Sequence, residues 1–390
     1  MADALSLLQK AEGFYARGRY DRARPLFARA REKTTDPYLR ADILHQEAET
    51  LRALGLFHRA LALYGRAHAL YRRLKVPTER LRTLLGVSAC LRVLGRYARA
   101  RALWRTVERA GRFGASSPPP EEIWMESALV ERGLGNFPRA RSLLQRALRA
   151  PGISPAARQH AWWSLGGVER FSGRLPSAVD AFSRAAALAR RLGDPSAEAF
   201  ALCGAGGVAR VLGRSAASLA FYRRAHGLLD RLGDPFGRAY GLCGMANAHR
   251  TYGDARKTLP LYHRSAGLYR RLGDESSEGF AWWGLGGSYR RLGRWAESRR
   301  AYGKALGLFR KSDDARGVVM ALLGLGAWAE ETDRAIRAVN FRERALREAR
   351  RHRLSYETAL ARWALDPRQV GGLGAFGVSP ATVKRWKDIP

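Results

Sequence analysis

The sequence predicts an all-α solenoid of stacked helix pairs, and three observations support this fold class. A glycine returns at positions 18, 55, 95, 135, 173, 213, 253 and 293, at intervals of 37 to 40 residues. A small residue, then an aromatic residue or leucine, then another small residue follow each glycine, as in Gly173, Ala178, Phe182 and Ala185. A Leu-Gly-Asp stop recurs at 192–194, 232–234 and 272–274. A fixed period of this length is typical of one small unit copied and stacked.

The segment 199–238 shows how each unit is organised. Its first half places small and apolar residues three and four positions apart, which is one face of a helix. Gly213 ends that helix, because glycine adopts the left-handed turn just beyond a helix terminus. A second helical pattern follows and stops at 232–235, where glycine is followed by a proline that cannot continue the helix. Each unit is therefore predicted to be an antiparallel helix pair with two short turns.

The unit resembles the tetratricopeptide repeat (TPR). The residues that carry the resemblance are Trp162, Leu165, Gly166, Gly173, Ala178, Phe182 and Ala185 in one unit, and Trp282, Leu285, Gly286, Tyr289, Gly293, Tyr302 and Ala305 in another. The resemblance implies a right-handed superhelical solenoid of about nine repeats. The period of 40 residues is longer than the usual repeat of about 34, and in this the chain is similar to the kinesin-light-chain and LGN-like branch.

Irregular segments suggest how the chain is divided. We expect a TPR-like solenoid over 1–357 and a C-terminal capping helix with a basic tail over 358–390. A loop insertion is expected over 111–122, because the stretch GASSPPP cannot continue a helix. Residues 150–156 form a second interruption. In the ninth unit Asp333 replaces the turn glycine and Arg342 replaces the aromatic residue, as expected of a degenerate terminal repeat.

The composition is that of a soluble protein with an extreme positive charge. The chain has 390 residues and a net charge of +34, and only eight of its 69 basic residues are lysine. Such a charge attracts acidic proteins, nucleic acids and anionic headgroups. No membrane span or secretion signal is visible, so we expect a cytoplasmic protein. The histidines and cysteines are scattered without ligand spacing, and no metal or other cofactor is expected.

An arginine recurs at one position of the first helix in seven consecutive units. We call Arg52, Arg92, Arg132, Arg170, Arg210, Arg250 and Arg290 the arginine ladder. In the TPR family the first helices line the concave surface, so the resemblance places the ladder there. Guanidinium groups pair bidentately with carboxylates and phosphates, which favours a groove for an acidic peptide. The alternative is that each arginine bonds carbonyls or an acid of a neighbouring unit and serves repeat stacking. The sequence leaves both interpretations open.

Aromatic residues accompany the ladder in units five to eight. The candidates for ligand contact are Trp163, Trp283, Phe200, Tyr240 and Phe280. The alternative for Trp163 and Trp283 is that they are wedges packed between helices. The family's clamp for chaperone C-termini needs lysine and asparagine at set concave positions, and only Asn247 fits.

The C-terminal segment 377–386 resembles the turn and recognition helix of a helix-turn-helix. Gly377 lies in the turn, Val378 and Val383 are packing residues, and Lys384, Arg385 and Trp386 would face nucleic acid. Ser379 is a suitable N-cap, with proline at the next position. The three glycines just before this segment are unfavourable in a supporting helix. A capped terminal tail is the alternative.

Together these patterns predict a non-catalytic adaptor that holds an acidic or phosphorylated segment of a partner protein on its arginine-lined concave face. One alternative is a nucleic-acid-binding or regulatory protein that uses the basic surface and the C-terminal segment. A second alternative is a structural assembly subunit. The sequence does not indicate an oligomeric state.

Overall fold

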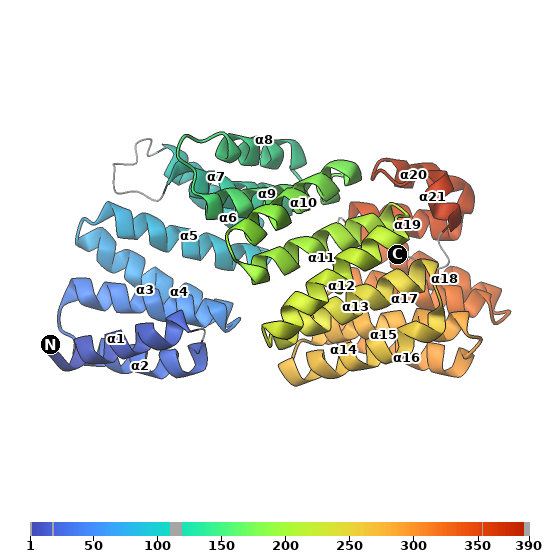
Figure 1. Cartoon of the computed structure of the whole chain (residues 1–390), viewed down its shortest axis with the longest axis horizontal. Helices are drawn as coiled ribbons and strands as arrows, with labels where there is room; N and C mark the ends of the chain where they lie inside the picture. The colour runs from blue at the N-terminus through green and yellow to red at the C-terminus, as the bar shows by residue number, and fades with distance from the viewer. Residues whose placement is uncertain (1, 18, 110–118, 353, 386–390) are drawn as a thin grey trace. The chain divides into compact units, whose positions relative to one another are not determined.

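The computed structural model describes residues 2–17, 19–109, 119–352 and 354–385, and every regular element in these ranges is helical (Figure 1). The chain divides into two compact parts, each containing several repeats. From here on, unit 1 means Met1–Ala157 and unit 2 means Arg158–Pro390, and the helix pairs are called repeats or pairs. The boundary lies next to the interruption at 150–156. The prediction of an all-α fold built from repeated helix pairs is confirmed.

Unit 1 contains four helix pairs. Its helices are α1 Ala2–Ala16, α2 Tyr20–Lys33, α3 Pro37–Ala53, α4 Phe57–Arg73, α5 Pro77–Val93, α6 Tyr97–Arg109, α7 Pro120–Gly133 and α8 Phe137–Leu148. Most of the predicted insertion, residues 111–118, lies outside the described residues, and α7 begins at Pro120.

Unit 2 continues with five helix pairs and a C-terminal segment. The pairs are α9 Pro155–Phe171 with α10 Leu175–Arg191, α11 Pro195–Val211 with α12 Ser215–Arg231, α13 Pro235–Tyr252 with α14 Thr258–Leu272, α15 Glu275–Arg291 with α16 Trp295–Lys311, and α17 Ala315–Glu330 with α18 Ala335–Arg351. A 3₁₀ turn, η1, spans Ala255–Lys257. The C-terminal segment comprises α19 Ser355–Leu365, the 3₁₀ helix η2 Pro367–Val370, α20 Gly371–Gly374 and α21 Pro380–Arg385.

The periodic glycines end first helices, as the sequence predicts. Six of them have positive φ, between 69° and 80°, at positions 55, 95, 135, 173, 213 and 293. Asp333 takes the same left-handed conformation in the ninth pair, with φ 55°. Gly18 lies outside the described residues. Gly253 differs, with φ −112°, because its turn runs into η1, where Asp254 accepts a hydrogen bond of 2.8 Å from the amide of Arg256.

Aromatic rings on the second helices hold consecutive repeats together. Tyr302 of α16 lies against Gly286 of its own pair and Gly324 of the next first helix, where an added Cβ would come within 2.5 Å and 2.3 Å of the ring. Phe182 is placed in the same way between Gly166 and Gly204. The glycines weaken their helices by about 1 kcal/mol each. They also let large rings fill the space between helices, where burial of an aromatic side chain is strongly stabilising.

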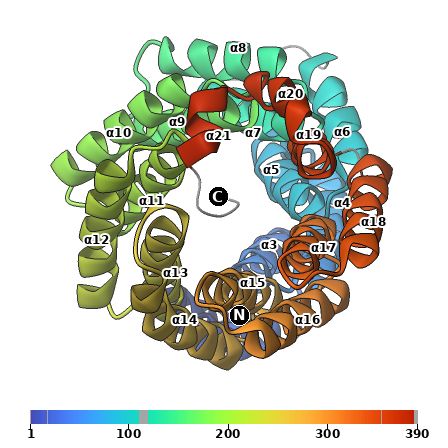
Figure 2. The ribbon, with the colours of Figure 1, turned by 90° about the vertical axis from the view of Figure 1, so that its right-hand side faces the viewer.

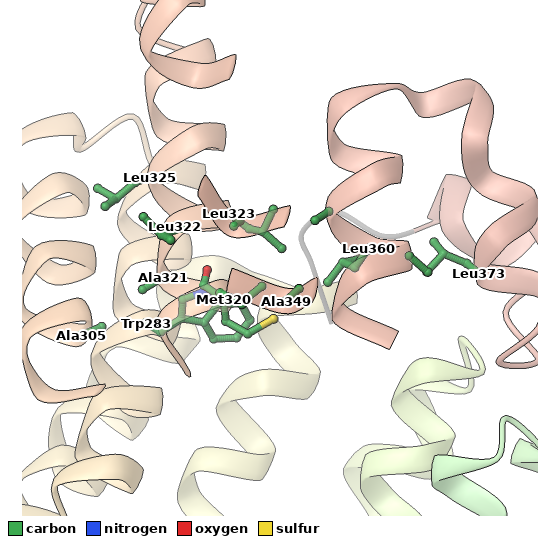
Figure 3. Close-up of a cluster of buried hydrophobic side chains, with 14 of the residues drawn as sticks. Trp283, Ala305, Met320, Ala321, Leu322, Leu323, Leu325, Ala349, Leu360 and Leu373 are labelled. Atoms are coloured by element: carbon green, nitrogen blue, oxygen red, sulfur yellow. The ribbon is translucent and has the colours of Figure 1, made fainter. Parts of the chain in front are cut away.

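The C-terminal segment packs back onto the first pair of unit 2. A Cβ added to Gly377 would lie 2.3 Å from the carbonyl oxygen of Gly173, in the turn between α9 and α10. Both glycines have positive φ, 80° at Gly173 and 73° at Gly377. Leu373 and Val378 are buried in the same apolar cluster as Leu175. Figure 2 shows α21 beside α9, and Figure 3 shows Leu373 next to Leu360 in this core.

All three cysteines are free and buried. Burial raises the pKa of Cys90 to about 11, that of Cys203 to about 12 and that of Cys243 to about 11. Because thiolates are the reactive species, we expect the native protein to resist alkylation by iodoacetamide at pH 8. Mass spectrometry should find three alkylated cysteines only after denaturation. Rapid modification of the native protein would contradict this assignment of buried thiols.

Candidate functional site

Unit 2 presents first helices on its inner side and second helices on its outer side. In Figure 2, α11, α13, α15, α17 and α19 line the inner side, and α10, α12, α14, α16 and α18 lie outside them. The ladder arginines of this unit come near the ends of α9, α11, α13 and α15. The other three, Arg52, Arg92 and Arg132, occupy the same position on helices of unit 1.

Arg250 is enclosed by the protein. Its side chain is 1% exposed, and its Nε donates a hydrogen bond of 3.1 Å to the hydroxyl of Tyr262. That hydroxyl donates to Oδ1 of Asn247 at 2.8 Å, and the guanidinium lies 4.3 Å from the ring centroid of Trp283. The indole of Trp283 in turn donates to the carbonyl of Met320 at 2.9 Å. Arg250, Asn247 and Trp283 therefore stabilise the packing of α13, α14 and α15.

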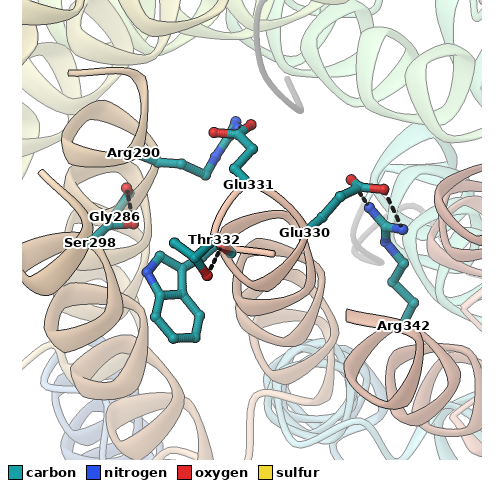
Figure 4. A network of polar contacts seen from close by, with 8 residues as sticks. Gly286, Arg290, Ser298, Glu330, Glu331, Thr332 and Arg342 are labelled. Atoms are coloured by element: carbon teal, nitrogen blue, oxygen red, sulfur yellow. Dashed lines mark hydrogen bonds and ion pairs between the residues drawn. The ribbon is translucent and has the colours of Figure 1, made fainter. Parts of the chain in front are cut away.

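Three other ladder arginines pair with glutamates of the same chain. Arg290 pairs with Glu331, which begins the turn after α17, and Figure 4 shows the two side chains meeting beside the ion pair between Glu330 and Arg342. Arg52 pairs with Glu49 on the same helix, α3. Arg92 on α5 pairs with Glu126 on α7, at 3.2 Å. The pairs of Arg92 and Arg290 join neighbouring repeats and fit the repeat-stacking interpretation, whereas the pair of Arg52 lies within one helix.

Arg170 is in a different environment. It is half-buried, and Nη1 lies 3.9 Å from the position a Cβ would take on Gly207 of the neighbouring helix α11. Burial lowers the pKa of Arg170, and Arg316 and Arg210 lower it further, while the hydroxyls of Tyr240 and Tyr222 oppose the change. No carboxylate is among these neighbours. A guanidinium whose charged form is disfavoured in this way would be stabilised by an incoming anion.

The two remaining arginines of the ladder are Arg132 and Arg210. Burial and the charge of Arg92 lower the pKa of Arg132 in unit 1. Arg210 is 9% exposed, and its charge opposes the rise in the pKa of Tyr222 that burial causes. Arg170 and Arg210 lie on adjacent first helices of unit 2, and both oppose the rise in the pKa of Tyr222 and Tyr240.

The predicted aromatic residues fall into two groups. Phe280 packs edge-on against Phe309 at 4.7 Å between ring centroids and, like Trp283, belongs to the core. Phe200 and Tyr240 lie on either side of Phe236, with centroid distances of 6.5 Å and 6.2 Å. Tyr240 is 37% exposed, and burial is the largest cause of the rise in its pKa.

Trp163 stacks on His160, with 5.9 Å between ring centroids and an interplanar angle of 22°. It is half-buried. The repeat pattern of the sequence does not single out Phe236. Its position after the Gly-Asp-Pro stop, three residues before the first core alanine of α13, is the signal that indicates it.

The C-terminal segment contributes residues to the same side of unit 2. Burial raises the pKa of Tyr356 on α19 to about 12, and Arg210, Arg316 and Arg170 act against this rise. Arg316 Nε pairs with Glu357 at 2.8 Å. The arginines near the ends of α9 and α11 therefore face α17 and α19, an arrangement that local sequence patterns do not reveal.

The structure describes the helix-turn-helix-like segment up to residue 385, and α21 begins at Pro380 directly after Ser379. Ser379 Oγ accepts a hydrogen bond of 3.2 Å from the amide of Thr382 and caps α21. Val378 and Val383 are buried, and Lys384 is exposed. The side chain of Arg385 and the whole of Trp386 lie outside what the structure describes. The preceding helix, α20, has only four residues.

The described side chains include no group of three or more His, Cys, Asp or Glu residues placed to hold a metal ion. No helix in the described part of the chain has the length and apolarity needed to cross a membrane.

Comparison with known proteins agrees with the fold. Two family models described as tetratricopeptide repeat match the chain, one over residues 277–351 and the other over 90–152 and 125–196. The chain therefore contains tetratricopeptide repeats over these residues. Its likeness to the kinesin-light-chain and LGN-like branch stays a prediction. Among curated proteins, none matches the sequence significantly.

Solved structures with the same fold include three with low sequence identity. A Rap protein complexed with competence and sporulation factor is 13% identical, with a TM-score of 0.59 over 78% of this chain and 89% of its own. The apo form of RapI is 12% identical, with a TM-score of 0.59 over 88% and 98%. NprR in complex with its cognate peptide NprX is 10% identical, with a TM-score of 0.54 over 77% and 90%.

Proposed function

We propose that this protein is a non-catalytic scaffold that binds an extended, acidic segment of a partner protein on the inner side of unit 2. The observation that carries the proposal is the environment of Arg170. Burial disfavours its charged form, Arg316 and Arg210 disfavour it further, and the hydroxyls of Tyr240 and Tyr222, rather than a carboxylate, are the main groups that favour it. A ligand carboxylate placed against Arg170 would gain a charge-assisted hydrogen bond and relieve the repulsion.

The surrounding residues suggest how the segment is held. Gly207 has no side chain, so a ligand backbone can approach α11 closely beside Arg170. Phe200, Phe236 and Tyr240 offer partly exposed rings to an apolar side chain of the ligand. In such an arrangement, guanidinium–carboxylate pairs set register and association rate, and buried rings supply most of the affinity.

The structural neighbours support this proposal at the level of the fold. The Rap protein is complexed with competence and sporulation factor and NprR with its cognate peptide NprX, so in NprR this fold accommodates a peptide ligand. The family models and these neighbours indicate no catalytic family. A cytoplasmic location remains part of the proposal.

A selection from a random peptide library tests the proposal. Dodecapeptides displayed on phage would be selected on immobilised full-length protein, and in parallel on the Arg170→Gln and Arg264→Gln variants. Arg264 is exposed on the outer helix α14 and serves as a control with the same change of charge. We expect wild type and Arg264→Gln to enrich peptides with Asp or Glu near an aromatic residue, and Arg170→Gln to lose this enrichment. Equal enrichment by all three proteins would contradict the assigned site.

A further inference from the structure

The positive charge of the chain is concentrated on the second helices of the pairs. The nine second helices, α2 to α18 in even numbers, contain 36 basic and eight acidic residues. The nine first helices contain 15 basic and 15 acidic residues. Second helices therefore carry +28 of the net charge of +34, whereas first helices are neutral. A coding preference for arginine would not distribute the charge in this way.

In unit 2 most of this charge is exposed and uncompensated. The five second helices carry 20 basic and five acidic residues, and 19 of the 20 basic side chains are exposed. Seven of the 20 form ion pairs. The other 13 have no carboxylate partner among the described residues. They are Arg190, Arg191, Arg223, Arg231, Arg264, Arg271, Arg299, Arg300, Arg310, Arg337, Arg344, Arg350 and Arg351.

Basic residues recur at the same register from one second helix to the next. Two complete rows have a spacing of 40 residues, one at 184, 224, 264, 304 and 344, the other at 191, 231, 271, 311 and 351. The rows are seven residues apart, about 10.5 Å along one helix face. Regular arrays of this kind match a polymer with evenly spaced charges better than a compact ligand.

Structural roles account for part of these rows only. Cations in the last turn of a helix interact favourably with its dipole, which explains the row that begins at Arg191. Arg184 lies over Trp162 at 4.9 Å, and Lys304 over Trp282 at 4.0 Å, so both stabilise their own helix pairs. Neither role applies to Arg264 of the first row, nor to Arg223 and Arg300, which lie outside the two rows. All three are exposed in the middle of α14, α12 and α16.

We propose that the outer side of unit 2, formed by α10, α12, α14, α16 and α18, binds the phosphate backbone of double-stranded nucleic acid without reading its sequence. This surface is separate from the inner side that holds the peptide. Arginine forks pair bidentately with phosphate oxygens, and neutralising successive phosphates releases counterions.

The exposed side chains favour a duplex over a membrane or a single strand. On α10 and α12 no large apolar side chain is exposed, and the other three helices expose only Leu272, Trp295, Ile336 and Val339 among their described residues. Helices that lie on membranes insert an exposed apolar face, whereas the apolar faces of these helices are packed against the first helices. Proteins that bind single strands stack bases on exposed aromatic rings, and Trp295 is the one such ring here.

A salt titration with a 30-base-pair DNA duplex tests this inference. Affinity would be measured by fluorescence anisotropy between ~50 and ~200 mM salt, the range over which phosphate-dependent binding weakens steeply. The test variant is Arg223→Gln, Arg264→Gln and Arg300→Gln combined. The matched control combines Arg214→Gln, Arg256→Gln and Lys257→Gln, which remove the same charge from the turns between first and second helices. All six residues are exposed, so both variants should fold, and circular dichroism would verify this.

We expect the logarithm of the association constant to fall linearly with the logarithm of the salt concentration. Losing one phosphate contact lowers this slope by about 1, so the test variant should lose about 3. The control variant should keep the wild-type slope. Equal losses in both variants would mean that net charge alone drives binding and would overturn the assigned surface. Binding to vesicles containing phosphatidylserine without binding to the duplex would assign the surface to membranes, and no binding to either probe would also overturn the proposal.

Discussion

Replacing Gly284 with alanine lowers the unfolding free energy by about 2–3 kcal/mol, although alanine is the better helix former. The reason is the ring of Tyr262, which is fully buried and lies against α15. A Cβ on residue 284 would come within 2.2 Å of Cζ of that ring. The ring cannot move away freely, because its hydroxyl bonds both Asn247 and Arg250.

Gly303→Ala is the matched control for this prediction. Gly303 lies in the interior of α16, and nothing lies within 4 Å of the position of its added Cβ. We expect this substitution to raise the unfolding free energy by about 0.5–1 kcal/mol, because alanine has the higher helix propensity. The midpoints of urea denaturation, followed by circular dichroism, measure both effects. If the denaturation midpoints of both variants shifted in the same direction, the aromatic rings of the second helices would not set the spacing between repeats.

Replacing Arg250 with methionine lowers the unfolding free energy by about 3 kcal/mol. Methionine retains much of the side chain's apolar volume but leaves the half-buried Asn247 and the buried Tyr262 without their guanidinium neighbour and removes the contact with Trp283. Arg170→Met removes a cation whose charged form is already disfavoured by burial and by Arg316. We expect that variant to stay within about 1 kcal/mol of wild type.

The comparison of these two variants separates structural from ligand-binding members of the ladder. Thermal and urea denaturation of the two proteins, under the same conditions, provide the measurement. A large loss of stability in Arg170→Met would show that this residue supports repeat stacking and would remove it from the proposed site. A neutral effect in Arg250→Met would contradict the network around Tyr262.

The sequence was sufficient to predict the repeat, because its signals are local. Turn glycines need positive φ, and small residues must lie where rings pack, so both recur with the period of the fold. Gly253 departs from this rule because Asp254 starts a 3₁₀ turn there. The contact between Gly173 and Gly377 joins residues about half the chain apart, and no periodic pattern encodes it.

The sequence also distinguishes the arginines of the ladder that form ion pairs with the next repeat from those that do not. The distinction appears when the residues 34 and 41 positions after each arginine are compared. Arg92 has a glutamate 34 positions later, at Glu126, and Arg290 has one 41 positions later, at Glu331. Glycines stand 34 positions after both Arg170 and Arg210, and Val211 and Thr251 stand 41 positions after them. Arginines at equivalent positions therefore have different roles, because the next repeat supplies an acid in one case and a glycine in the other. The environment of Arg250 depends on three helices and needed the structure.

The most direct test of the proposed function is the affinity of one selected acidic peptide for three proteins. Calorimetric titration would compare wild type, Arg170→Gln and Arg264→Gln at a single salt concentration. The proposal predicts that Arg170→Gln weakens binding by about tenfold or more, the loss of one charged hydrogen bond, and that Arg264→Gln binds like wild type. Unchanged affinity in a folded Arg170→Gln variant, or equal weakening in both variants, would contradict peptide binding on the inner side of unit 2.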